Sequence, residues 1–164
     1  FAGTAFFTAQ EEAGKSWRFV HEWFKKNKIS TDKLVVLDTS PYETREEADK
    51  QLVVLRNKDV NAKFKSPLLK ELKQFCKKNK ISFSCKDKFI IEKNKLREKE
   101  GLKPISIGST ELGRIVMESN GQIQGSTLQI PTTGYHTVDE TASVESIKAI
   151  IFILSSFYIK TVNI

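Results

Sequence analysis

Cysteine and histidine are scarce in this sequence, which limits the ways in which its fold can be stabilised. Its 164 residues include two cysteines, Cys76 and Cys85, and two histidines. Two thiols make no disulfide framework, and without a nearby histidine pair they fall short of the four ligands of a structural zinc site. We therefore expect reduced thiols in a cytoplasmic protein, with Cys76 packed in the core on the same helical face as Leu72.

A long hydrophobic segment is also absent. The longest apolar stretch, residues 149–159, is interrupted by Ser155 and Ser156 and is much shorter than the ~20 residues needed to cross a bilayer. It predicts a buried helix, and we expect no membrane partner. No signal peptide precedes the first residues, which look like a strand and lack a starting methionine, so we expect the N-terminal part of a longer protein to be missing.

Acidic residues are too few to balance the basic ones. The chain has 27 lysines and arginines against 20 aspartates and glutamates, a net charge of +7. Charge alone leaves open a basic nucleic-acid module. However, basic runs at residues 25–28 and 77–80 fall at the ends of predicted helices, where cations complement the helix dipole and face water. We therefore interpret them as solvated surface and expect no nucleic-acid partner.

Apolar periodicity predicts an alternating series of strands and helices in a single domain, residues 1–164. Strands are expected at residues 2–9, 34–37, 51–56, 81–84 and 123–130, and helices at residues 15–28, from Ser66, at residues 110–119 and from Ser143. We expect a polar loop at residues 39–50, and a possible strand at residues 88–92 before an exposed, mobile stretch. This alternation is typical of an α/β fold with a layered sheet.

Two acidic positions coincide with the ends of predicted strands. Glu11 and Glu12, within Gln10-Glu11-Glu12-Ala13-Gly14, end the first strand, and Asp38 follows residues 34–37. Open α/β sheets place their working groups at the carboxyl ends of strands, so both positions suit a site. A glutamate pair is also common at a solvated helix start, and an aspartate after a strand is also a common turn or cap residue.

A histidine follows another predicted strand. His136 lies in the segment Ile130-Pro131-Thr132-Thr133-Gly134-Tyr135-His136-Thr137. Zinc prefers imidazole and carboxylate, so Glu12, Asp38 and His136 are ligands of the right types in suitable topological places. The other histidine, His21, lies within a predicted helix without companion ligands, and we interpret it as structural or surface.

Four segments, taken in order, resemble metallopeptidase family 42, the tetrahedral and glutamyl aminopeptidases, some of which carry an endoglucanase label. They run from Gln10 to Gly14, Val35 to Asp38, Gly108 to Arg114 and Ile130 to Thr137, and match Q-E-E-x-G, V-D, G-G-T-D-x-G and I-P-x-R-Y-x-H-S. Asp38 and His136 are 98 residues apart (136 − 38), too few for the extra domain of family 20 enzymes. This spacing points to family 42, with the related family 28 as the alternative.

The resemblance implies roles for individual residues. Glu11 is similar to the family's general base, and Glu12, Asp38 and His136 resemble three of its metal ligands. Two zinc ions, often replaced by cobalt, hold a shared water in this family. Gly108, Ser109 and Thr110 correspond to a substrate-facing loop. The sequence departs from the pattern where Ser109 replaces a glycine, where Glu111 replaces an aspartate, and where residues 137–140 replace Ser-Pro-x-Glu.

The resemblance also implies a fold and partners. It predicts a three-layer αβα sandwich of the phosphorylase/hydrolase type with a mixed, mostly parallel sheet, forming the C-terminal part of a zinc aminopeptidase catalytic domain. The family's H-x-D element and bridging aspartate precede Q-E-E, so we expect this fragment to need an N-terminal half for activity on peptides, and to form a homo-oligomer. The alternative is a non-catalytic remnant or subunit whose exposed sheet edge binds a partner chain.

Overall fold

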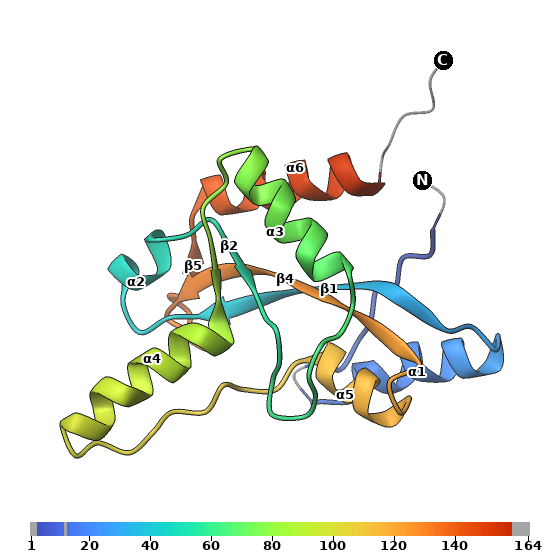
Figure 1. Cartoon of the computed structure of the whole chain (residues 1–164), viewed down its shortest axis with the longest axis horizontal. Helices are drawn as coiled ribbons and strands as arrows, with labels where there is room; N and C mark the ends of the chain where they lie inside the picture. Colours follow the sequence, from blue (N-terminus) through green and yellow to red (C-terminus); the bar gives the residue numbers. More distant parts are fainter. Residues whose placement is uncertain (1–2, 12, 159–164) are drawn as a thin grey trace.

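The computed structural model describes residues 3–11 and 13–158 and has a mixed α/β fold (Figure 1). In chain order its elements are α1 (Ser16–Lys26), β1 (Thr31–Pro41), α2 (Arg45–Asp49), β2 (Val53–Leu55), α3 (Leu68–Lys78), β3 (Phe83–Cys85), α4 (Lys86–Lys99), α5 (Glu111–Glu118), β4 (Ile123–Thr133), β5 (Thr141–Ala142) and α6 (Val144–Tyr158). The predicted alternation of strands and helices is therefore confirmed.

The strands form one five-stranded mixed sheet in the order β1-β4-β2-β3, with β5 added beside β4. The pairings β1–β4 and β2–β3 are parallel, whereas β2–β4 and β4–β5 are antiparallel. The longest pairing joins β1 to β4, from Thr31 opposite Ile123 to Pro41 opposite Thr132. In the part of the chain that the structure describes, β1 pairs with β4 alone, so its other side is a sheet edge.

Helices cover both faces of this sheet, with α3 and α6 on one face and α1 and α5 on the other (Figure 1). Leu128 of β4 belongs to a buried cluster with Leu72 of α3 and Ile153 of α6. Ile123, an odd number of residues earlier on the same strand, packs with Val20 and Ile115 on the opposite face. The layered arrangement expected from the sequence is therefore present.

Several predicted helices begin and end close to the expected residues. Thr110 caps α5, since its Oγ1 accepts a hydrogen bond from the Gly113 amide at 3.1 Å. Lys25 and Lys26 lie in the last turn of α1, and Lys77 and Lys78 in the last turn of α3, all of them exposed. The expected placement of these lysines at helix ends is therefore confirmed.

The core position of Cys76 is also confirmed. Its side chain is fully buried within the cluster that contains Leu72. Burial raises the pKa of the Cys76 thiol to about 11, because the thiolate is poorly solvated there. Among the described residues both cysteines are free thiols.

The strand predicted at residues 2–9 is wrong. Residue 2 lies outside the described residues, and residues 3–9 form neither strand nor helix. Phe6 instead packs against α1, with ring centroids 5.0 Å from Trp23 and 5.8 Å from Phe24. The apolar residues that suggested a strand therefore serve side-chain packing and not main-chain pairing.

The predicted end of the strand at residues 34–37 is also wrong. β1 continues to Pro41, so Asp38 lies inside the strand, because Thr39 and Ser40 pair with Ile130 and Pro131 of β4. The expected loop at residues 39–50 contains α2 as well. Its start is capped by Thr44, whose hydroxyl accepts a hydrogen bond from the Glu47 amide at 3.1 Å.

Residues 88–92 form part of helix α4 and not a strand. In α4 the buried residues are confined to the first turns, at Lys86, Asp87 and Ile90. Because only one end of α4 is covered, its sequence has no apolar stripe of helical period along its length. The consecutive apolar residues at 89–91 therefore suggested a strand.

The final helix is present but is buried on one side only. Ala149 and Ile153 of α6 are buried, whereas the side chains of Ile151 and Phe152 are 57% and 48% exposed. The expectation of a buried helix is therefore corrected. Within residues 3–11 and 13–158, no helix is both long enough and apolar enough to cross a membrane.

Candidate functional site

Three distant segments of the chain line a pocket of about 330 Å³ next to the start of α5. The first is the turn before α1, the second is the loop that leads into α5 together with its first turn, and the third follows β4. The lining residues are Glu11, Ala13, Gly14, Ser109, Thr110, Glu111, Arg114, Tyr135 and His136. Four residues that the sequence singled out, Glu11, Ser109, Thr110 and His136, therefore meet at one place.

The first wall is a tight turn that carries Glu11. The Gly14 amide donates to the carbonyl of Glu11 at 2.6 Å, and the Lys15 amide donates to the carbonyl of Gln10 at 3.1 Å. Gly14 has a φ of +63°, a region that favours glycine, and an added Cβ would lie 2.4 Å from Nη1 of Arg114. Glu12, the predicted metal ligand beside Glu11, lies outside the described residues.

The second wall is the loop that leads into α5. The buried carboxylate of Asp59 holds this loop in place through hydrogen bonds. Oδ2 of Asp59 accepts hydrogen bonds from the Thr110 amide at 2.7 Å and the Thr110 hydroxyl at 2.8 Å. Its Oδ1 accepts from the amides of Asn61 and Ala62 at 2.7 and 3.0 Å. A Cβ on Gly113 would lie 2.0 Å from Oδ2, so this glycine leaves the space that Asp59 occupies.

The rest of this loop is bonded to the same segment after β2. The guanidinium of Arg56 donates to the carbonyl of Ile107, and the Val60 amide donates to the carbonyl of Gly108 at 3.1 Å. Nδ2 of Asn61 donates to Oγ of Ser109 at 2.7 Å. Each residue from Ile107 to Thr110 therefore has a partner in residues 56–61, which gives the pocket a fixed wall.

Arg56 is itself buried and links this wall to the sheet. Its side chain is 4% exposed, and Nε donates to Oε1 of Gln129 at 2.8 Å. Burial lowers the pKa of the Arg56 guanidinium, while the nearby carboxylates of Asp38 and Asp59 act in the opposite direction.

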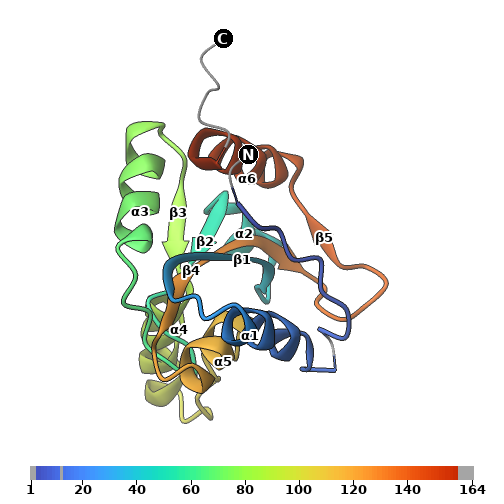
Figure 2. The ribbon, with the colours of Figure 1, turned by 90° about the vertical axis from the view of Figure 1, so that its right-hand side faces the viewer.

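Helix α5 also holds the start of α1. The carboxylate of Glu111 accepts hydrogen bonds from the Ser16 hydroxyl and from the Trp17 amide, the latter at 3.2 Å. A carboxylate at this position complements the positive end of the α1 dipole. In the view of Figure 2, α1 and α5 lie side by side below the sheet.

The third wall is the loop between β4 and β5. The Thr137 amide donates to the carbonyl of Gly134 at 3.0 Å, and the His136 amide donates to Oε2 of Glu140 at 3.3 Å. His136 has a φ of +60°, and its exposed ring stacks on that of Tyr135 with centroids 3.8 Å apart. The predicted position of His136 in a loop after a strand is therefore confirmed.

Asp38 lies on β1 and has hydrogen-bond partners within the sheet. Asp38 does not line the pocket; its Oδ2 accepts a hydrogen bond from Nε2 of Gln129 at 3.1 Å, and its Oδ1 accepts one from the Thr39 amide at 2.7 Å. Gly108 supports the loop without lining the pocket. The residues that the structure describes, which exclude Glu12, contain no cluster of three His, Cys, Asp or Glu side chains suited to a metal ion.

Sequence reasoning missed the residues that support the pocket. Arg56 and Asp59 follow β2, where a charge directly after the apolar residues Val53 to Leu55 was the available signal. Arg114 lies within the quoted segment from Gly108, three residues after Glu111, a spacing that places both on one helix face.

Comparison with known proteins gives similar structures but no similar sequences. No family model and no curated protein sequence matches the chain. Aminopeptidase APDkam598 from the archaeon Desulfurococcus kamchatkensis is similar with a TM-score of 0.64 and 16% identity, over 92% of this chain and 39% of its own. A TET aminopeptidase from the marine sediment archaeon Thaumarchaeota archaeon SCGC AB-539-E09 gives 0.61 and 18%, over 91% and 37%.

A third structure, PhTET1-12s, described as a dodecamer, has a TM-score of 0.59 and 18% identity, over 90% of this chain and 38% of its own. The fold of this chain is therefore the fold of a part of TET aminopeptidases. The chain spans less than two fifths of the length of each of these proteins.

Proposed function

We propose that this chain forms part of the active site of a metal-dependent aminopeptidase, which hydrolyses the N-terminal peptide bond of its substrates. The observation that carries the proposal is the pocket, where Glu11, Ser109 and His136 meet from three distant parts of the chain. The likeness to part of several aminopeptidase structures supports it. The proposed architecture is a three-layer αβα sandwich of the phosphorylase/hydrolase type.

In this proposal Glu11 transfers the proton. Its carboxylate lines the pocket and takes a proton from the attacking water as the water adds to the peptide carbonyl, then delivers it to the leaving amine. Such assistance typically accelerates a reaction by about 10² to 10⁴. The loop from Gly108 to Thr110 orients the substrate, because its bonds to residues 56–61 hold it in one conformation.

The proposal includes two zinc ions, which cobalt can replace, with Glu12, Asp38 and His136 as ligands. The described residues fit this only in part: His136 is exposed at the pocket, whereas Asp38 is outside the pocket lining and accepts a hydrogen bond from Gln129. A full ligand set needs further groups. Zinc bound there supplies Lewis-acid activation of water and of the peptide carbonyl.

The first experiment compares pairs of peptides that differ only in a free or acetylated N-terminal amine, followed by mass spectrometry with zinc or cobalt present. The protein is used in its complete cellular form. Peptides with a free amine are expected to shorten one residue at a time, and acetylated peptides to stay intact. Absence of cleavage with both metals, or equal cleavage of both peptides, contradicts an aminopeptidase.

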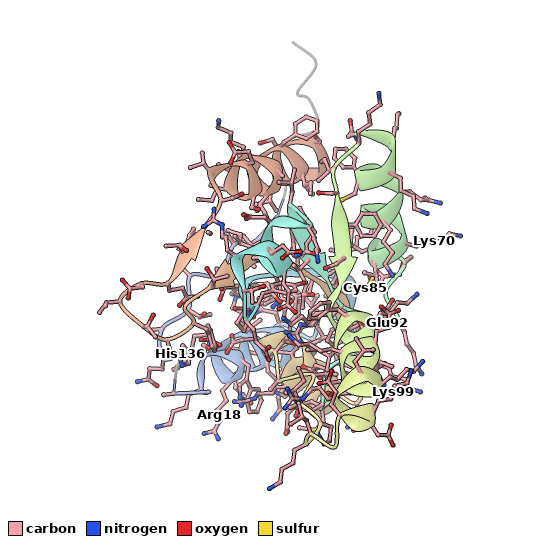
Figure 3. The ribbon with its side chains drawn as sticks, turned by 90° about the vertical axis from the view of Figure 1, so that its left-hand side faces the viewer. Arg18, Lys70, Cys85, Glu92, Lys99 and His136 are labelled. Atoms are coloured by element: carbon pink, nitrogen blue, oxygen red, sulfur yellow. The ribbon has the colours of Figure 1, made fainter. Side chains whose placement is uncertain are left out.

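Matched variants then test the assigned residues. Glu11→Gln and His136→Ala are expected to lower kcat/KM by about 10²-fold or more, because each removes a group that contacts the reacting atoms. Glu92→Gln and His21→Ala serve as controls; Glu92 lies on α4, across the molecule from His136 (Figure 3). Equilibrium dialysis with zinc provides a separate readout, since His136→Ala is expected to bind less metal than His21→Ala.

A second candidate function is a non-catalytic subunit that binds a partner chain. The observation that favours it is β1, which is 11 residues long and pairs on one side only within residues 3–11 and 13–158. An unpaired edge presents main-chain donors and acceptors to an added strand. Stable assembly without peptide hydrolysis favours this function. Assembly into a homo-oligomer, as in the dodecamer of PhTET1-12s, is compatible with both.

A further inference from the structure

We propose that Arg114 is a positioning residue, whose guanidinium fixes the turn that carries Glu11 against the loop from Gly108 to Thr110. The inference rests on the proposed function, because only a catalytic role of Glu11 makes the relative position of these two walls important for a reaction.

Arg114 contacts both walls of the pocket. Its Nη1 donates a hydrogen bond to the carbonyl of Gly14 at 2.6 Å, in the turn before α1. Its Nε donates to Oγ of Ser109 at 3.3 Å, in the loop before α5. One side chain therefore bridges two segments that are 95 residues apart in sequence (109 − 14).

The turn depends on such an anchor. Gln10, Glu11 and Ala13 are exposed, and residues 3–11 belong to no strand or helix. The carbonyl of Gly14 accepts a second side-chain hydrogen bond, from Nε1 of Trp17 at 3.0 Å. The bond from Arg114 ties this carbonyl to α5, while the bonds that Glu111 accepts from Ser16 and Trp17 hold the first residues of α1 to the same helix.

The contact is specific to a guanidinium. The planar group directs two N–H donors along different lines, which a lysine ammonium on a flexible chain does not reproduce. Gly14 completes the fit, because a Cβ at this position would lie 2.4 Å from Nη1. The close approach of the guanidinium to the main chain therefore requires both residues.

Hydrogen exchange of the folded protein tests this position directly. In Arg114→Ala, the amides of Gly14 and Lys15, which close the turn, are expected to exchange about tenfold faster, the factor expected for loss of a charge-assisted hydrogen bond. Guanidinium at tens of millimolar, far below the molar range in which it unfolds domains, is expected to restore protection. Unchanged exchange at both amides overturns the proposal.

Two further variants separate positioning from general destabilisation. Arg97→Ala removes an equivalent bond, from Nε of Arg97 to the carbonyl of Lys103 at 2.8 Å, at the exposed end of α4, and is expected to leave exchange at Gly14 and Lys15 unchanged. Arg114→Lys keeps the charge and is expected to give intermediate exchange, which decides the question if Arg114→Ala does not fold. Equal acceleration in Arg97→Ala overturns the proposal.

Kinetics connects the position to the reaction. Arg114→Ala is expected to lower kcat by about 10²-fold with a smaller change in KM, since a misplacement of about 1 Å near the reacting atoms has this effect, and guanidinium is expected to restore part of kcat. Faster exchange with an unchanged kcat overturns the catalytic purpose. If the unaltered protein hydrolyses no peptide, the proposed function fails. Hydrogen exchange then still tests whether Arg114 fixes the turn.

Discussion

Lys86 is a cation that the fold removes from water. Its side chain is 5% exposed, its ammonium donates to the carbonyl of Pro41, and it lies 3.7 Å from the centre of the Tyr42 ring. Burial, reinforced by the nearby positive charge of Arg56, lowers the pKa of Lys86 from 10.5 to about 8. The contacts with the carbonyl and the ring recover only part of the lost hydration.

The free energy of unfolding is therefore expected to depend on pH through Lys86. Between its folded pKa of about 8 and its unfolded value of 10.5, the unfolded chain binds the proton and the folded protein does not, so stability rises with pH in this window. Relative to Lys86→Met, the unaltered protein is expected to gain about 3 kcal/mol between pH 7 and pH 11. Urea unfolding at several pH values measures this.

The control for this experiment is Lys95→Met, because Lys95 is an exposed residue of the same helix. It reports the effect of losing a surface lysine without a change in the core. A stability difference between the unaltered protein and Lys86→Met that stays flat from pH 7 to pH 11 contradicts the expectation.

Elements that contain their own signals were predictable, and those that depend on distant residues were not. Helix α5 has a capping threonine and an apolar face that packs on one side, so its boundaries follow from local sequence. Residues 39–41 look like a polar loop, but they extend β1 because residues 130–132 of β4 are aligned beside them. Pairing between residues about 90 positions apart overrides local preference.

The pairing of β1 with β4 requires a glycine at one point. A Cβ on Gly125 would lie 2.0 Å from the carbonyl oxygen of Leu34, a main-chain atom that cannot move without shifting the strand. Gly125→Ala is therefore expected to lower the free energy of unfolding by about 3 kcal/mol, as measured by urea denaturation.

Gly101→Ala is the matched control for Gly125→Ala. Gly101 has a φ of +70° with no atom within 4 Å of an added Cβ, so this variant is expected to cost only about 1 kcal/mol, from the backbone conformation. If the two variants lose the same free energy of unfolding, the close approach of β1 and β4 at Gly125 does not add to the cost of the substitution.

At the scale of the whole molecule, the pocket was partly predictable. Glu11 and His136 were identified because each lies in a short recognisable segment, and both line the pocket. The strand that carries Asp38 was expected to end there, whereas β1 continues past it, and Asp38 is not among the residues that line the pocket. The contacts of Asp59 and Arg114 arise only when segments about 50 and 100 residues apart come together. Local sequence carries no record of such contacts.

The net charge of +7 belongs to the molecule as a whole and not to one surface site. The basic runs lie in the last turns of α1 and α3, which cover opposite faces of the sheet (Figure 1). Fluorescence anisotropy is therefore expected to show weak, sequence-independent binding of DNA at about 20 mM salt that disappears by about 150 mM. Binding that persists at the higher salt contradicts this expectation.

The bond from Arg114 to Gly14 joins residues 100 positions apart, and the bond from Ser16 to Glu111 joins residues 95 apart. The third wall comes later still, at residues 135 and 136. A chain emerging from the ribosome therefore has no pocket until most of this domain has been synthesised and β4 has been added beside β1. Whatever chemistry the pocket performs therefore begins only after all three of its walls have been synthesised and brought together.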